Sequence, residues 1–210
     1  MADKGFRRLK IFIPAAGENK TAQSFVIEGI TNKGATSTVE ITGLSKEATT
    51  VAGSDGVYYI SREGVGDAKA VFGLLDIPHA TEAAILGYEA DEDGLTFVGE
   101  KTEAPYCSVV IEDTDLAGNK GEIGLFRGTF AKDTAKSIKT LDPKETFTPE
   151  AESYTFTMAR AETAEDAGRY EVEYYGKEDA EAFAKLEAKV LTDAFKIDGA
   201  AAEGASDPKA

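Results

Sequence analysis

The chain has 210 residues, and its 38 acidic and 23 basic side chains give a formal net charge of −15. Such a charge repels nucleic acid and acidic membrane surfaces. One cysteine, Cys107, and one histidine, His79, exclude an internal disulfide and supply too few ligands for a Cys/His metal cluster. The charge has two interpretations, namely ordinary solubility or a surface that must not adhere to a polyanion passing close by.

The sequence carries no recognisable export or membrane signal. Its first residues include two arginines but no apolar run of the length that a signal peptide needs. No segment approaches about 20 apolar residues, the length that crosses a bilayer. We therefore expect a protein that is made and kept in a cytoplasm.

The first quarter of the chain reads as short strands separated by turns. Alternation of basic and apolar residues predicts a strand over 8–13, and further strands are predicted over 23–30 and 37–42, with a turn at 32–34 between them. Residues 43–56 are small and polar, which predicts a long exposed loop or a mobile hairpin. A structureless loop of that length is uncommon unless it is functional, and a plain linker is the other interpretation.

Strands over 57–62 and 67–77 lead to a short helix. Pro78 suits the first position of that helix, which we expect over 80–86 with its end at Gly87. The section 81–100 is strongly acidic, and Asp93-Gly94 predicts a tight turn before a short strand over 95–98.

The middle of the chain predicts a hairpin. Its strands cover 104–112 and 122–130, and the residues between them have the Gly and Asn chemistry of a turn. After a polar connection over 132–149, Tyr154, Phe156 and Met158 alternate with polar residues in a strand over 153–160. We expect this strand to form a second hairpin with the last strand, 168–175.

One long helix is predicted over 178–195. Phe183, Leu186 and Val190 recur on one face of it, which favours packing on the core, although a docking face for a second subunit is the alternative. We predict one domain over 1–198, with a disordered tail over 199–210. The fold class is α+β and mainly β, an antiparallel β-sandwich or split barrel with a flanking short helix and a C-terminal helix.

Reactive residues are few. Cys107 lies in an apolar run, which predicts a buried, inert thiol, and His79 lies at a helix entrance without a nucleophile motif, which predicts a surface or capping role. The glycine-rich stretches lack the residues of a phosphate-binding loop. The acidic cluster 91–93 does not match a calcium loop. No catalytic, cofactor or metal site is predicted.

Basic residues are densest at Arg7, Arg8 and Lys10, on or beside the first strand. Three scattered cations do not make a nucleic-acid footprint. We expect this patch to serve a subunit interface that meets an acidic neighbour.

Three stretches, in this order and spacing, resemble the major tail protein family of long, non-contractile-tailed bacteriophages, the tail-tube proteins. The first ends a short helix, the second enters a strand, and the third is an aromatic-basic-glycine strand followed by a polar linker and a Thr-rich strand. They are Ile85-Leu86-Gly87, Ala104-Pro105-Tyr106 and Phe126-Arg127-Gly128. The resemblance is firmest over 65–160.

The resemblance implies a structural virion protein without an active site. Six subunits would close a ring around a channel, and rings would stack into a tube through which DNA passes without specific binding, in a virion tail assembled in the host cytoplasm. A loop between early strands, with the chain termini, would grip the neighbouring ring. By order, that inter-ring loop holds Gly43, Leu44, Lys46, Thr49, Val51, Ser54 and Asp55.

The implied partners are further copies of the chain, a tape-measure protein, a tail terminator and baseplate or distal tail proteins, with no membrane and no cofactor. Two other hypotheses stay open from the residues alone. One is a monomeric β-sandwich binding or adhesion module with a site on its loops. The other is a hydrolase with a carboxylate pair, because such pairs are set in space rather than in sequence.

Overall fold

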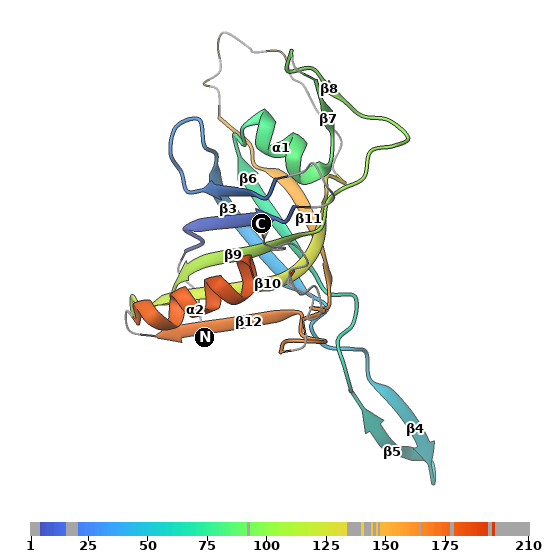
Figure 1. Cartoon of the computed structure of the whole chain (residues 1–210). Helices are drawn as coiled ribbons and strands as arrows, with labels where there is room; N and C mark the ends of the chain where they lie inside the picture. The colour runs from blue at the N-terminus through green and yellow to red at the C-terminus, as the bar shows by residue number, and fades with distance from the viewer. Residues whose placement is uncertain are drawn as a thin grey trace, which may run out of the picture.

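The computed structural model describes residues 5–15, 21–91, 93–133, 148–163, 165–176 and 179–192, with residues 140, 144, 146 and 195 (Figure 1). Within that part, eight strands form one antiparallel sheet in the order β2-β1-β9-β10-β11-β6-β3, with β12 also paired to β10. The strands of this main sheet are β1 (Arg8–Ile13), β2 (Gln23–Ile27), β3 (Ala35–Thr42), β6 (Lys69–Leu75), β9 (Cys107–Thr114), β10 (Lys120–Ala131), β11 (Glu152–Ala159) and β12 (Glu171–Gly176).

Two small hairpins and two helices complete the described part. The hairpins are β4 (Thr49–Gly53) with β5 (Gly56–Ser61), and β7 (Glu89–Ala90) with β8 (Thr96–Phe97), and neither pairs with the main sheet. The helices are α1 (His79–Leu86) and α2 (Ala180–Leu191).

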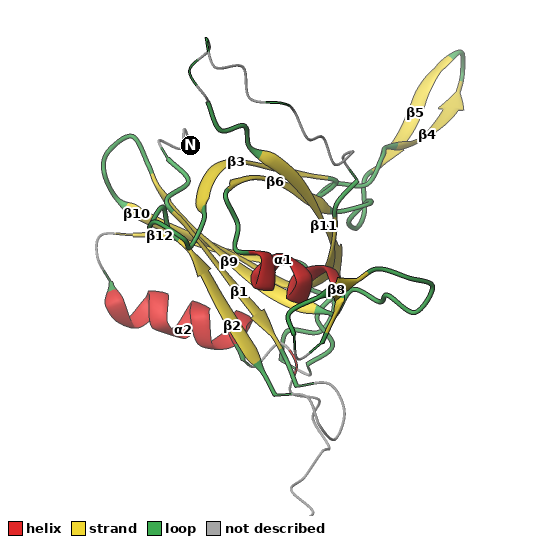
Figure 2. Ribbon diagram, turned by 90° about the horizontal axis from the view of Figure 1, so that it is seen from above, coloured by secondary structure: helices red, strands yellow, loops and turns green. Residues whose placement is uncertain are grey.

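Strand β10 organises the main sheet because it pairs with three others. Its residues 120–125 lie between β9 and β12, and its residues 127–131 pair with β11. A register shift between Leu125 and Gly128 bends the strand. At Gly128 a Cβ would collide with the Thr157 carbonyl oxygen, so the bend requires glycine. The sheet therefore curls instead of lying flat (Figure 2).

The hydrophobic core fills the inside of the curl. Phe72, Phe130 and Phe156 are buried there. The ring centroid of Phe130 lies 5.8 Å from that of Phe72 and 4.9 Å from that of Phe156. Leu9 and Ile11 of β1 join the same core. Buried and half-buried residues alternate along β1, as period-two strands require when one face meets a core.

Helix α1 closes one end of the curled sheet (Figure 2). It ends at Gly87, whose φ of 71° is the left-handed conformation that closes helices. Lys132 Nζ donates to Glu82 of α1 at 2.6 Å and to Glu152 of β11 at 2.8 Å. The Tyr154 hydroxyl oxygen lies 3.0 and 2.9 Å from the same two carboxylates, and its single proton can be donated to either. Burial, reinforced by these carboxylates, raises the pKa of Tyr154, so the phenol keeps its proton.

Helix α2 covers the outer face of the sheet over β9, β10 and β12 (Figures 1 and 2). Its Leu186 and Val190 pack in a second apolar cluster with Val110 and Phe126. Gly124 of β10 makes room, because a Cβ there would lie 2.5 Å from a Val190 methyl group. The predicted core-facing role of this helix is confirmed.

The fold class is confirmed: the described residues form a mainly β, antiparallel structure that is not a closed barrel. The predicted second hairpin is wrong. Strands β11 and β12 do not pair with each other, because both lie along the same edge of β10 on either side of its bend. A twelve-residue strand is long enough to hold both partners end to end.

Two local predictions are also revised. Of the two predictions for 43–56, a long loop or a hairpin, the structure has the hairpin: β4 occupies 49–53 and pairs with β5. The strand expected over 95–98 is the two-residue β8, paired with an unpredicted β7. Most of 132–149 and all of the tail 199–210 lie outside the described residues. The single domain over 1–198 stays a prediction.

Candidate functional site

The hairpin of β4 and β5 projects from the body of the protein (Figure 1). Together with its connecting segments it forms what we call the arm, residues 43–66. Thr and Val in β4, and Val, Tyr and Ile in β5, favour extended backbone. Ser54 and Asp55, the two central residues of the turn, have φ of 50° and 65°. Positive φ at both positions is what a type I′ turn requires, and this turn matches the twist of paired strands.

The base of the arm is held by close backbone contacts. Gly66 N donates to Gly43 O at 2.9 Å, and Lys46 N donates to Gly64 O at 3.2 Å. Gly43 has φ of 78°, and a Cβ on it would collide with the Asp67 carbonyl. The arm is thus fixed where it leaves β3 and β6.

The arm exposes apolar side chains along its length. Every residue of β4 is exposed, as are all residues of β5 before Ser61. Tyr58 is 84% exposed. Asp55 is the only charged residue between positions 48 and 61, in a chain that is 29% charged. Depletion of charge together with exposed aromatic residues is the composition of a protein interface core.

The predicted inter-ring residues take three positions on this arm. Gly43, Leu44 and Lys46 lie at its base, Thr49 and Val51 lie on β4, and Ser54 and Asp55 form the turn. The structure brings these residues into one projecting element. The prediction missed the β5 residues Val57, Tyr58, Tyr59 and Ile60, which are the more exposed apolar ones. The run 56–61, which carries no charge, is the signal that could have found them.

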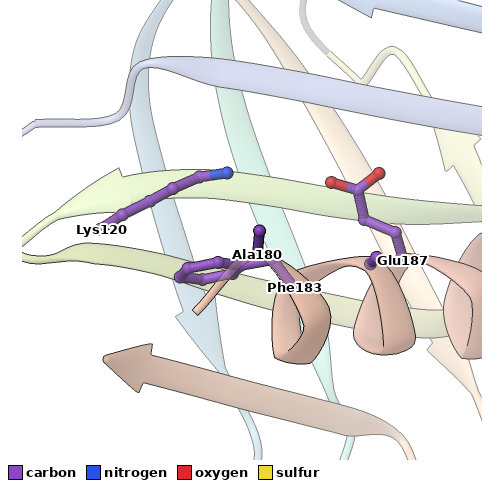
Figure 3. A pocket seen from close by; sticks show the side chains of 5 residues that line it. Lys120, Ala180, Phe183 and Glu187 are labelled. Atoms are coloured by element: carbon purple, nitrogen blue, oxygen red, sulfur yellow. The ribbon is translucent and has the colours of Figure 1, made fainter. Parts of the chain in front are cut away.

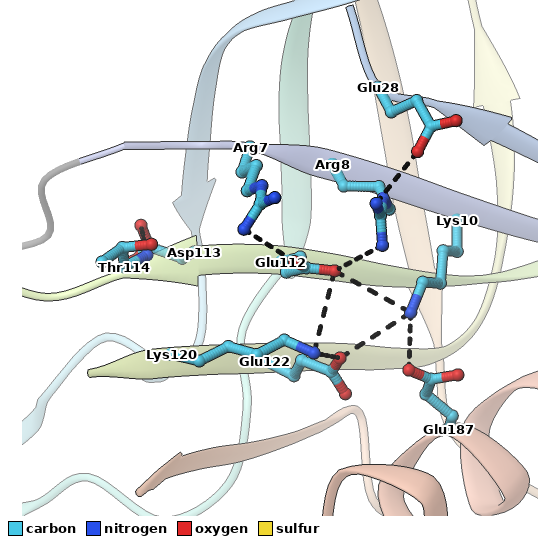
Figure 4. Close-up of polar contacts among 10 residues, drawn as sticks. All are labelled: Arg7, Arg8, Lys10, Glu28, Glu112, Asp113, Thr114, Lys120, Glu122 and Glu187. Atoms are coloured by element: carbon cyan, nitrogen blue, oxygen red, sulfur yellow. Dashed lines mark hydrogen bonds and ion pairs between the residues drawn. The ribbon is translucent and has the colours of Figure 1, made fainter. Parts of the chain in front are cut away.

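The predicted N-terminal patch belongs to an ion cluster on the outer face of the sheet (Figure 4). Glu112 of β9 lies 3.2 Å from Arg8, 3.8 Å from Lys120 and 3.9 Å from both Arg7 and Lys10. Arg8 also pairs with Glu28, and Lys10 with Glu122 and Glu187. We call this set the N-terminal charge cluster: Arg7, Arg8, Lys10, Glu28, Glu112, Lys120, Glu122 and Glu187.

The cations and carboxylates of the charge cluster are equal in number and belong to one chain. The cluster holds four cations and four carboxylates, and Glu112 and Glu122 are almost completely buried. Arg8 and Lys10 are therefore engaged by the chain's own carboxylates, while the Arg7 side chain remains 70% exposed. The role of Arg7, Arg8 and Lys10 at a subunit interface stays a prediction, and Arg7 is the member best placed for it.

Two carboxyl groups of the charge cluster are shifted in opposite directions. Burial raises the pKa of Glu122, although Lys120 Nζ lies 3.0 Å from its Oε1. Burial also acts to raise the pKa of Glu187, but the hydrogen bond and charge of Lys10 outweigh it, and that pKa is lowered. The cluster thus fastens β1 to α2 through Glu187, beside a carboxyl group that resists ionisation.

A shallow pocket beside the charge cluster has no group of lining residues arranged for catalysis. It is lined by Lys120, Ala180, Phe183, Ala184 and Glu187 (Figure 3). Lys120 lies 4.5 Å from the centre of the Phe183 ring. Its two charged residues are held by partners in the cluster, and its other lining is apolar.

The candidate reactive residues lie apart from each other. Cys107 is buried in β9, and burial raises the pKa of its thiol, which confirms the predicted buried cysteine. His79 lies on the surface, with its Nε2 2.8 Å from Thr96 Oγ1. Among the described residues, no three His, Cys, Asp or Glu side chains gather as metal ligands would. No helix in that part of the chain could span a bilayer.

A projecting apolar hairpin and a charge cluster with equal numbers of cations and carboxylates characterise a protein that acts through its surfaces. The family model of the phage tail tube protein matches residues 16–200, so the chain belongs to the phage tail tube protein family. It is a structural component of a virion tail, as the resemblance predicted. No curated protein and no solved structure matches the chain.

Proposed function

We propose that the chain builds the tail tube as stacked hexameric rings, with a channel through which the genome passes into the host. Membership of the tail tube family supports the assembly. The observation that carries the proposal is the arm, an ordered hairpin whose apolar side chains are left in water in the single chain. Exposed apolar surface of this kind is costly unless a partner covers it.

The arm is the proposed contact between rings. Its base is fixed by the Gly43–Asp67 approach, while its strands lie clear of the main sheet. A hairpin anchored at one end can reach a neighbouring subunit and bury Tyr58, Tyr59 and Ile60 there. Buried aromatic side chains are typical anchors of protein interfaces.

The negative net charge of the chain suits the proposed channel. Each cation that neutralises a phosphate adds affinity through counterion release, which would hold DNA in place. A chain with net charge −15 can line a channel without that effect. DNA is accordingly expected to pass without specific binding. Assembly in the host cytoplasm, and contacts with tape-measure, terminator and distal tail proteins, belong to the same proposal.

Electron microscopy of the purified chain tests this function. Negatively stained samples over a range of protein concentrations, with light-scattering mass on the same samples, should show six-fold rings or tubes with a central channel. Assembly should strengthen with salt, because salt screens repulsion between acidic subunits while apolar contacts persist. A strict monomer at every concentration, also with the partner tail proteins added, would contradict the proposal.

A further inference from the structure

Exposed apolar side chains gather on two appendages of the protein. Of the thirteen large hydrophobic residues that are exposed in the described part, six belong to the arm and three to the hairpin of β7 and β8. We call the second appendage the flap, residues 88–103. Its three exposed residues are Leu95, Phe97 and Val98, at 59%, 52% and 68%. Isolated exposed hydrophobic residues are ordinary, but clusters on ordered hairpins mark contact sites.

The flap is held in shape despite its short strands. Asp91 Oδ1 accepts hydrogen bonds from Leu95 N at 2.7 Å and from Asp93 N at 3.1 Å. Thr96 Oγ1 lies 2.8 Å from His79 Nε2 at the start of α1. At the base of the flap, a Cβ on Gly87 would collide with the Glu103 carbonyl oxygen. The apolar residues of the flap are thus displayed on a fixed support, as those of the arm are.

The arm and the flap lie at opposite ends of the molecule (Figure 1). One chain cannot bring its own arm to its own flap without unfolding the sheet between them. Two copies in the same orientation can, because the arm of one then faces the flap of the next. Such a head-to-tail contact uses two different surfaces and repeats without limit, which is the geometry of an open polymer.

Charge favours this pairing over contact between two flaps. Acidic residues rim the flap, among them Glu89, Asp93 and Glu100, whereas positions 94–99 carry no charge. Two flaps would bring like charges together, which costs free energy. The arm carries a single charge, Asp55, between positions 48 and 61, so its aromatic residues can cover the flap with less repulsion than a second flap would meet.

We infer that the arm of one copy of this chain docks on the flap of a second copy in the adjacent ring, with Tyr58 and Tyr59 against Phe97 and Val98. This inference rests on the proposed function, because it names the surface that receives the arm between stacked rings.

Disulfide trapping tests the contact directly. Cys107 is buried and stays out of the reaction, so Tyr58→Cys and Phe97→Cys each add one accessible thiol. Assembled particles of the double variant are oxidised and separated by denaturing electrophoresis without reductant. A ladder of covalent dimers, trimers and longer species is expected, since each chain links to one copy above and one below. Val57→Cys with Val98→Cys provides a second pair if the first disturbs assembly.

Matched controls separate this contact from others. Each single variant alone should give no covalent dimer, because arm does not meet arm. Tyr58→Cys with Leu116→Cys should give none either, since Leu116 is 69% exposed but lies in the β9–β10 turn. Tubes that form normally without a ladder from either pair would overturn the inference and leave the proposed function standing. Absence of any assembled particle from the unmodified chain, also with the partner tail proteins added, would overturn the proposed function, and the inference with it.

Discussion

Lys10 Nζ of β1 lies 2.5 Å from Glu187 Oε1 of α2, which joins the first strand of the chain to its last described helix. The pair sits beside Glu122, whose side chain is fully buried. It supplements the apolar contacts of Leu186 and Val190 that hold α2 on the sheet. The charge cluster therefore has a structural role within one subunit, whatever it contributes between subunits.

Replacing Glu187 tests how much the Lys10–Glu187 ion pair stabilises the packing of α2 on the sheet. Glu187→Gln removes a charge-assisted hydrogen bond, and we expect the free energy of unfolding to fall by about 1–2 kcal/mol. Glu181→Gln is the matched control, because this substitution removes the same charge from an exposed position of the same helix. Chemical denaturation of both variants measures the difference. Equal losses from the two would show that the Lys10 pair adds nothing.

Glu122 should make stability depend on pH in a defined direction. Burial raises its pKa above the unfolded value of about 4.3. The folded state then binds this proton more tightly, so the contribution of Glu122 to stability falls as pH rises above that value. Glu122→Gln cannot ionise and escapes the loss.

The measurement is the melting temperature of Glu122→Gln minus that of the unmodified chain, followed from about pH 4 to about pH 7. This difference should become more positive as pH rises through the window above the unfolded pKa. A difference that stays constant would show that ion pairing with Lys10 and Lys120 cancels the effect of burial, and one that becomes more negative would show that ion pairing outweighs it.

Gly43 should tolerate no side chain. An alanine there combines positive φ with a collision against the Asp67 backbone, and we expect a loss of about 2 kcal/mol or more in the free energy of unfolding. Gly118→Ala is the control, since Gly118 has φ of 86° but open space around its Cβ position. It should lose about 1 kcal/mol. Similar losses would mean that the close approach at the arm base costs nothing.

Cys107 should be unreactive in the folded chain. Its thiol is buried, and burial raises its pKa, so little thiolate forms at neutral pH and reagents cannot reach it. A chromogenic thiol reagent should react slowly with the native chain and rapidly after denaturation. Phe97→Cys supplies an exposed comparison in the same fold. Labelling of native Cys107 at the rate of the exposed thiol would contradict the burial.

Local patterns predicted the elements well, because they depend on neighbouring residues. The alternation of Tyr154, Phe156 and Met158 reports one buried face directly. The partner of β12 could not be predicted in this way, since it depends on where β10 bends. That bend is set by the approach of Gly128 to Thr157, a contact between residues distant in sequence.

The charge cluster left a usable signal in the sequence. Glu112 and Glu122 lie in strands predicted to form one hairpin, and they are direct cross-strand partners. Two carboxylates in that position repel each other unless cations are supplied from elsewhere. Arg8, which pairs with Glu112 across β1 and β9, is one such cation. Its side chain pairs with Glu28 and Glu112, and its role at a subunit interface stays a prediction.

The proposed role of the arm is to link one ring to the next. Replacing residues 47–63 by Asn-Gly keeps Gly43 and Gly66 at the base and closes the arm as a short turn. Circular dichroism should show the main sheet unchanged, because the arm strands do not pair with it.

The decisive measurement is the length distribution of particles of this arm-replaced chain in negative-stain electron microscopy, beside the unmodified chain under the same conditions. We expect single rings or unassembled subunits from the variant, and tubes from the unmodified chain. Tubes of normal length from a correctly folded variant would contradict the assignment of the arm as the contact between rings.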